Sequence, residues 1–136
     1  MILGIGTDIV DIRRIDRILS QFPQAFPKKI FTQKEIHKAI NRREPAHTFA
    51  RLYAGKEAFI KALGGSFGMK WHDIEILNDE QGKPYVHVSG VALRVLQDKT
   101  HHKPYHIHLS LSDDPPYALA FLVIEVLYDK IHNAAF

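Results

Sequence analysis

The sequence of residues 47–65 is HTFARLYAGKEAFIKALGG, and its pattern decides how the rest of the chain is interpreted. Placed at about 100° per residue, its apolar side chains fall on one stripe, the face that a helix buries. Paired glycines follow the last apolar residue and are typical of a helix end. We therefore predict a helix over residues 47–63 that packs on the core. The stripe is formed by Phe49, Tyr53, Ile60 and Leu63.

Three charged residues of this predicted helix lie in its apolar stripe or on the adjacent face. Lys56 falls in the middle of the apolar stripe, and its ammonium group needs a counter-charge because an unpaired buried charge is strongly destabilising. Glu57 and Lys61 lie one turn apart on the adjacent face. Their neighbours have almost no side chain, so another molecule can lie close to the helix there. These neighbours are Ala50, Ala54 and Gly64.

The N-terminal residues 1–10 are rich in Ile and Val and predict a strand, with Gly4, Gly6 and Asp8 on one face. Glycines in a strand allow another backbone or a ligand to come close. Between Ile12 and Phe22 the apolar spacing changes to the helical period. Three basic residues share one side of this second predicted helix: Arg13, Arg14 and Arg17.

The remaining segments predict short helices and antiparallel strands. Thr32 and Glu35 form a capping-box signature for a helix over residues 33–41, and residues 91–96 suggest another short helix. The last predicted strand is apolar on both faces and is therefore expected in the centre of the sheet. Because helices and hairpins are segregated along the chain, we predict an α+β fold. Strands are predicted over residues 73–77, 84–89, 106–112 and 117–128.

The chain of 136 residues is 46% hydrophobic and 24% charged, which indicates a single globular domain over residues 1–136. Its net charge of +3 favours anionic partners. The absence of cysteine excludes disulfides, thiolate metal sites and a cysteine nucleophile. No basic leader precedes Asp8, and the apolar stretch from Tyr117 to Tyr128 is shorter than the roughly 20 residues of a membrane span. We therefore expect a soluble, cytoplasmic protein.

The acidic residues admit two interpretations. In the first, Glu57 and Lys61 form an ordinary ion pair on a solvated helix face, and Asp8 caps the helix that follows it. In the second, Asp8 and Glu57 are oxygen ligands of a Mg²⁺ ion whose other positions are taken by water and substrate phosphate oxygens. Lys61 would then neutralise charge on the same phosphates. The residue types and their positions permit both.

Four segments, GIGTDIVDIRRI, FARLYAGKEAFIKALG, DIEILNDEQGKPYV and HLSLSDDPPYALAFLVIE, cover most of the chain. Together and in this order they resemble the holo-acyl-carrier-protein synthases of the 4′-phosphopantetheinyl transferase superfamily. The resemblance implies a Mg²⁺-dependent transfer of 4′-phosphopantetheine from coenzyme A to a serine of apo acyl carrier protein, which releases adenosine 3′,5′-bisphosphate and serves fatty acid biosynthesis. It also implies an antiparallel sheet packed against a long helix, and a homotrimer with active sites at the subunit interfaces.

The same resemblance implies roles for individual residues. Asp8 and Glu57 would be the metal ligands, and Lys61 would contact the coenzyme A diphosphate. Either Glu57 or a metal-bound water would take the proton of the attacking serine, and the sequence does not choose between them. The acidic recognition helix of the carrier protein would dock at Arg14, on the basic face that also includes Arg13 and Arg17.

A further part of the coenzyme is implied to lie near two glycine-containing segments. Gly64 and the turn over residues 82–84 would lie beside the adenosine 3′-phosphate. The turn residues are Gly82, Lys83 and Pro84.

The chain departs from the family pattern at three positions. Leu52 stands where many members have arginine, and the nearest arginine, Arg51, is rotated by about 100° from that position on a helix. Asp113 stands where some members have histidine, and a carboxylate cannot donate to a phosphate. Ile60 occupies a position that is often small, and we assign it to the core.

Three other classes of function compete with this interpretation. A zinc site is suggested by nearby histidines, of which His106 and His108 share a strand face, but no third ligand is identifiable. A nucleic-acid-binding domain is suggested by the basic residues, but these do not interleave with exposed aromatics. A transferase of the same superfamily that serves a different carrier protein is disfavoured because such enzymes are longer.

Overall fold

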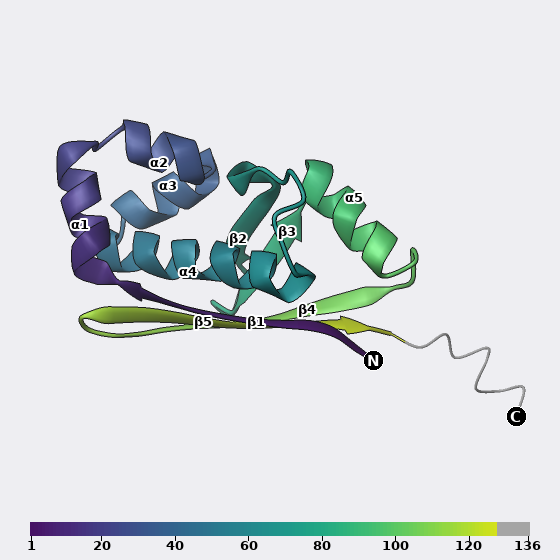
Figure 1. The fold of residues 1–136 in the computed structure, drawn as a ribbon. Helices are drawn as coiled ribbons and strands as arrows, with labels where there is room; N and C mark the ends of the chain where they lie inside the picture. The colour runs from purple at the N-terminus through teal and green to yellow at the C-terminus, as the bar shows by residue number, and fades with distance from the viewer. Residues whose placement is uncertain (128–136) are drawn as a thin grey trace, which may run out of the picture.

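The computed structural model describes residues 1–127, which form two antiparallel sheets and a layer of helices (Figure 1). The predicted α+β class is confirmed, and Tyr128, the last residue of the final predicted strand, lies outside the described residues. The elements are β1 (Ile2–Asp11), α1 (Ile12–Gln21), α2 (Ala25–Ile30), α3 (Gln33–Ile40), α4 (Pro45–Leu63), the 3-10 turn η1 (Trp71–Asp73), β2 (Ile74–Asn78), β3 (Pro84–Val88), α5 (Gly90–Lys99), β4 (Tyr105–Asp114) and β5 (Tyr117–Val126).

The larger sheet has the strand order β1-β5-β4, all antiparallel, with β5 in the centre as predicted. Its buried face packs on α4, and side chains of β5 alternate between that face and the opposite one. Figure 1 shows the helices on one side of this sheet only. On the opposite face, large apolar side chains are between 43% and 63% exposed within the described chain. These are Ile5, Ile9, Leu119 and Phe121.

The backbone of α4 lies directly against β1, as the glycines of that strand allow. A Cβ atom at Gly4 would lie 1.8 Å from the carbonyl oxygen of Ala62, and one at Gly6 would lie 1.8 Å from that of Ala58. Two strand residues and four helix residues both advance by roughly 6–7 Å. Continuing this register places Asp8 beside Ala54, on the helix face that carries Glu57 and Lys61.

The helices differ from prediction at several boundaries, such as those of α5, which spans Gly90–Lys99 and not residues 91–96, and by one helix that was not predicted. The long helix begins at Pro45 and not at His47, because proline is favoured in the first turn, where its missing N–H costs no hydrogen bond. Helix α2 was not predicted, since its six residues, AFPKKI, include a proline and lack a helical period. The capping box of Thr32 and Glu35 forms as predicted.

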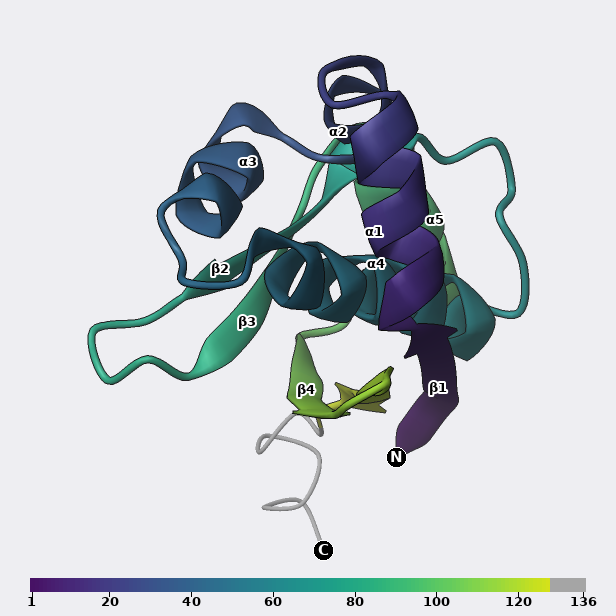
Figure 2. The same cartoon turned by 90° about the vertical axis from the view of Figure 1, so that its left-hand side faces the viewer.

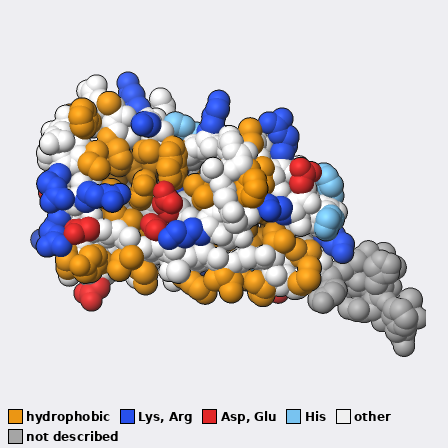
Figure 3. Space-filling view, in the orientation of Figure 1, with side chains coloured by type: hydrophobic (Ala, Val, Ile, Leu, Met, Phe, Trp, Pro, Cys, Tyr) orange, Lys and Arg blue, Asp and Glu red, His pale blue; other side chains and the backbone are white. Residues whose placement is uncertain are grey.

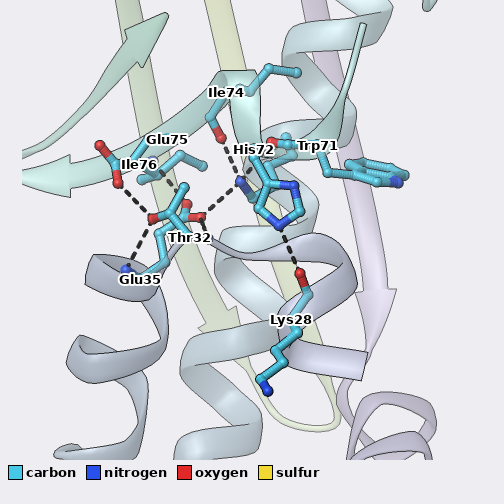
Figure 4. A network of polar contacts seen from close by, with 9 residues as sticks. Lys28, Thr32, Glu35, Trp71, His72, Ile74, Glu75 and Ile76 are labelled. Atoms are coloured by element: carbon cyan, nitrogen blue, oxygen red, sulfur yellow. Dashed lines mark hydrogen bonds and ion pairs between the residues drawn. The ribbon is translucent and has the colours of Figure 1, made fainter. Parts of the chain in front are cut away.

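The counter-charge that Lys56 requires is Glu35. Both side chains are fully buried, and the Lys56 Nζ lies 2.8 Å from Glu35 Oε1. Lys56 also donates to the carbonyl oxygens of Trp71, at 3.0 Å, and Ile74. Figure 4 shows that the Glu35 carboxylate also accepts from the backbone N–H of Ile76 and from that of Thr32, the N-cap residue of α3. One buried ion pair therefore joins α3, α4 and β2, which the capping-box prediction alone did not reveal.

None of the helices within residues 1–127 is long and apolar enough to span a membrane.

Candidate active site

Lys61 bridges α4 to β1. Its Nζ lies 3.1 Å from Asp8 Oδ1 and donates to the carbonyl oxygen of Thr7 at 3.0 Å. Among residues 1–127 no ion pair joins Lys61 to Glu57, so the interpretation of these two residues as an ordinary pair one helical turn apart is wrong. The helix cap proposed for Asp8 is also wrong, because Asp11 caps α1. Asp8 instead projects from the middle of its strand toward α4.

Glu57 lies on the same face of α4 as Lys61. Tyr53 stands one turn before Glu57 on that helix. Burial raises the pKa of Tyr53, and the charges of Glu57 and Asp8 raise it further, while the charge of Arg14 lowers it. The phenol therefore lies within the electrostatic reach of residues from β1, α1 and α4. This brings together Asp8, Glu57 and Lys61, the three residues that the sequence singled out, with Arg14 nearby.

The carboxylate oxygens of Asp8 and Glu57 fit a magnesium ion. Mg²⁺ prefers carboxylate oxygens and is usually bound through one or two protein carboxylates, with waters and substrate phosphates completing its shell. Asp8 and Glu57 offer two such groups on a floor of small residues. No group of three or more histidine or acidic side chains that could enclose a metal ion occurs within the described part of the chain. Asp8 and Glu57 therefore suit a metal site whose other ligands are water and substrate, and not a structural site enclosed by protein ligands.

A second polar site lies where the end of α3, the start of α4 and the β2–β3 turn meet. It is a pocket of about 200 Å³ with three cationic side chains, Lys38, Arg42 and Arg51. Burial, with the charges of Arg42 and Arg51, lowers the pKa of Lys38 to about 8, although Glu35 opposes this shift. Crowded cations of this kind favour an anion. The other lining residues are Thr48, Leu52, Asn78, Gly82, Pro84 and Leu111.

Sequence reasoning missed Lys38 and Arg42 as site residues. The detectable signal was their spacing of four positions at the end of a predicted helix, where like charges repel each other. Gly82 and Pro84 line the pocket, whereas the Lys83 backbone N–H donates to Asp79 Oδ1 at 2.9 Å within the turn.

The departures from the family pattern have structural counterparts. Arg51 forms an ion pair with Asp113 at 3.1 Å and donates to the Thr48 hydroxyl at 3.2 Å. His47 lies 3.0 Å from the same Asp113 carboxylate. Asp113 thus orients the wall of the basic pocket by holding Arg51. Ile60 is partly buried against the core, in agreement with its assignment.

The two sites lie on different sides of α4. Around the helix axis, Arg51 is about 120° and Thr48 about 180° from Glu57. Asp8 belongs to β1 and Asp113 to β4, the two outer strands of the three-stranded sheet. Gly64, which ends α4 in the left-handed region with φ 87°, is roughly 20 Å along the helix from Arg51. Within one chain, the structure therefore does not bring Gly64 together with the Gly82 turn.

The basic face of α1 is exposed. Arg13 forms an ion pair with Asp11 at 2.8 Å, while Arg14 and Arg17 project from the same helix. Figure 3 shows basic side chains gathered over the α1 side of the molecule. Figure 2 shows the ribbons of α1, α2 and α3 above that of α4. A hollow of about 730 Å³ is lined by residues of these four helices. Its apolar wall includes Ile12, Leu19, Ile36, Ile40 and Phe49.

The histidines of β4 do not form an enclosed metal site in the described residues. His106 and His108 stack with ring centroids 4.3 Å apart, and His108 Nε2 lies 3.0 Å from Glu125 Oε1. They lie on the exposed face of the larger sheet.

Comparison with known proteins agrees with this geometry. Residues 4–122 match the family model of the 4′-phosphopantetheinyl transferase superfamily. The chain is 45% identical over 132 residues to the holo-[acyl-carrier-protein] synthase of Roseobacter denitrificans, which covers 93% of this chain and 97% of the relative.

Solved structures show the same likeness. The holo-[acyl-carrier-protein] synthase of Neisseria meningitidis matches with a TM-score of 0.80 and 37% identity, over 92% of this chain and 99% of that one. The synthase of Bacillus anthracis, solved in complex with coenzyme A (3′,5′-ADP), matches with a TM-score of 0.75 and 31% identity over 93% and 99%. The chain belongs to the 4′-phosphopantetheinyl transferase superfamily and, within it, to the holo-[acyl-carrier-protein] synthases.

Proposed function

We propose that this enzyme transfers 4′-phosphopantetheine from coenzyme A to a serine of apo acyl carrier protein in a Mg²⁺-dependent reaction. Adenosine 3′,5′-bisphosphate is released, and the product serves fatty acid biosynthesis in the cytoplasm. The observation that carries the proposal is the cluster of Asp8, Lys61 and Glu57, which meets on a floor without side chains at the contact of β1 and α4. Two carboxylates and an ammonium group are the charges that a diphosphate and its cation require.

Each residue of this cluster has a defined task in the reaction. Asp8 and Glu57 would hold the magnesium ion, which when bound would offset the negative charge of the diphosphate. Lys61 is held by Asp8 and the Thr7 carbonyl, and its ammonium group stabilises charge that develops on the leaving phosphate. Glu57 is proposed to accept the proton of the attacking serine, with a metal-bound water as the alternative. The nucleophile belongs to the carrier protein, so the enzyme needs no nucleophile of its own.

The basic pocket is proposed as the site of the coenzyme's 3′-phosphate. Lys38, Arg42 and Arg51 supply positive charge, and the Gly82 and Pro84 turn forms the opposite wall. A bound phosphate would relieve the repulsion among the cations and raise the pKa of Lys38 from about 8. Gly64 and Lys83 are proposed to lie at the edge of the bound coenzyme.

A homotrimer with interfacial active sites is proposed, and the separation of the two sites within one chain supports it. One coenzyme molecule that reaches the basic pocket of one chain meets the Asp8, Glu57 and Lys61 cluster of a neighbour. The uncovered apolar face of the larger sheet supplies a surface for such assembly, and Figure 3 shows apolar side chains along that lower edge of the molecule. A head-to-tail contact that closes on itself gives a ring.

Subunit complementation tests this arrangement. A Glu57→Gln variant and an Arg42→Glu/Arg51→Gln variant are each expected to be inactive. Co-expressed and purified as mixed trimers, they are expected to recover activity at about a third of the sites, because one of the three head-to-tail interfaces in a ring that holds both variants has both halves intact. Tagged copies purified together provide the sample, and a trimer of Glu57→Gln alone is the control. No recovery in a mixed trimer would show that one chain carries a complete site.

The carrier protein is proposed to dock on α1. Arg14, Arg13 and Arg17 offer positive charge to an acidic recognition helix, which favours rapid encounter. The adjoining apolar hollow would accept the non-polar face of that helix. The charge of Arg14 lowers the pKa of Tyr53, which connects this face with the Glu57 side of α4.

The direct test is the mass of the carrier protein. The enzyme is incubated with apo acyl carrier protein, coenzyme A and Mg²⁺, and the carrier is expected to gain one phosphopantetheine group, read by mass spectrometry. Excess EDTA is expected to prevent the gain, and added Mg²⁺ to restore it. An unchanged mass in the presence of folded enzyme and excess Mg²⁺ would reject the proposed reaction.

A further inference from the structure

Tyr53 lies beside the acidic cluster and has no task in the reaction described above. It stands four residues before Glu57 on α4, a spacing that places the two side chains on the same face, one above the other. Its phenol is half-buried, and the charges of Glu57, Asp8 and Arg14 all act on it. A hydroxyl among these residues points to a role in the site.

The ring of Tyr53 packs against one other aromatic ring. It packs against the Trp71 ring with centroids 5.5 Å apart and an interplanar angle of 30°. The Trp71 backbone is fixed in turn, because its carbonyl oxygen accepts from the buried Lys56 Nζ at 3.0 Å. Lys56 is paired with Glu35 in the core. The buried ion pair thus fixes the backbone of Trp71, against whose ring Tyr53 packs. This packing limits the movement of the phenol away from Glu57.

Glu57 needs such a partner. Lys61 is engaged by Asp8 and Thr7, and within residues 1–127 no ion pair involves Glu57. The terminal torsion of a glutamate is broad, so an unrestrained carboxylate samples many orientations. A donor one turn earlier on the same helix restricts that range.

We propose that Tyr53 is a positioning residue, whose hydroxyl donates to the Glu57 carboxylate and fixes its orientation toward the metal ion and the attacking serine. The inference rests on the proposed role of Glu57 and assigns to Tyr53 a function beyond core packing. Partners of this kind typically contribute about 10- to 100-fold to metal affinity or activity.

Tyr53→Phe removes the hydroxyl and keeps the ring. We expect kcat to fall about 10- to 100-fold, with an unchanged KM for the carrier protein and an unchanged Tm. The affinity for Mn²⁺, used as the spectroscopic probe of the metal site and followed by electron paramagnetic resonance, is expected to weaken. Tyr105→Phe, which removes a hydroxyl from a half-buried tyrosine at the start of β4, is the matched control and is expected to behave as wild type.

Two further variants separate the possible failures. Tyr53→Leu also removes the contact with Trp71; a loss of kcat and Mn²⁺ affinity confined to Tyr53→Leu, or a Tm for Tyr53→Phe as low as that of Tyr53→Leu, would overturn the proposal and leave Tyr53 a packing residue. Glu57→Gln is measured in parallel. Full activity of Glu57→Gln would reject the role of Glu57, whereas an inactive Glu57→Gln beside a fully active Tyr53→Phe would reject the positioning role alone.

Discussion

Replacing Asp8 by Asn or Glu57 by Gln is expected to lower kcat/KM by about 10³-fold, because each change removes a charged oxygen ligand at a reaction that cleaves a doubly charged diphosphate. Both replacements keep the size of the side chain, and both residues lie at the edge of the core, so the fold is expected to remain. The measurement is the rate of phosphopantetheine transfer to the carrier protein. Asp98→Asn, on the exposed side of α5, is the matched control and is expected to leave the rate unchanged.

A titration with Mg²⁺ distinguishes the two carboxylates. If Asp8 acts only as a ligand, raising the Mg²⁺ concentration restores part of the rate in Asp8→Asn, since the metal site is weakened and not destroyed. Glu57 is also proposed to accept the proton of the serine, and excess metal does not replace that function. Equal rescue of both variants would remove the proton-accepting role of Glu57, and wild-type rates without rescue would remove the metal assignment.

The second large effect is expected in the core. Lys56→Ala leaves the Glu35 carboxylate buried without its partner, and breaking a buried ion pair in this way costs about 3–5 kcal/mol. The carbonyl oxygens of Trp71 and Ile74 also lose their donor. For a chain of this size the Tm is expected to fall by roughly 10–20 °C. Thermal unfolding followed by circular dichroism measures it.

The double variant Lys56→Met/Glu35→Gln separates charge from packing. It buries no unpaired charge, and its glutamine carbonyl can still accept from the Ile76 N–H, so we expect it to recover part of the stability that Lys56→Ala loses. A Tm of Lys56→Ala equal to that of the wild type would show that the pair contributes nothing to the fold.

Local patterns predicted most of the architecture. The periodicity of residues 47–63, the glycines at its end and the Thr32 capping box depend on neighbouring residues, and all three appear in the structure. The central place of β5 followed from its apolar sequence. By contrast, Pro45 was placed before the helix, because proline ends helices as well as beginning them.

Contacts between residues far apart in the chain could not be predicted from the sequence. Lys56 clearly required a counter-charge, but nothing local indicates that Glu35 supplies it, since the same carboxylate already satisfies a helix cap. Lys61 had an acidic residue four positions away and pairs with Asp8 instead. Lys38 and Arg42 resembled a solvated helix face until the β2–β3 turn closed a pocket beside them. These contacts depend on how elements pack, which a pattern within one element does not encode.

The close contact of β1 with α4 also bears on how the protein tolerates change. At Gly4 and Gly6 the two elements meet through main-chain atoms, so the spacing of Asp8 from Glu57 and Lys61 does not depend on the size of any intervening side chain. Substitutions elsewhere in the core can repack without altering that spacing. The distances of Asp8 from Glu57 and Lys61 can therefore be kept while other core residues change in evolution. A side chain at Gly4 or Gly6 would instead push β1 and α4 apart.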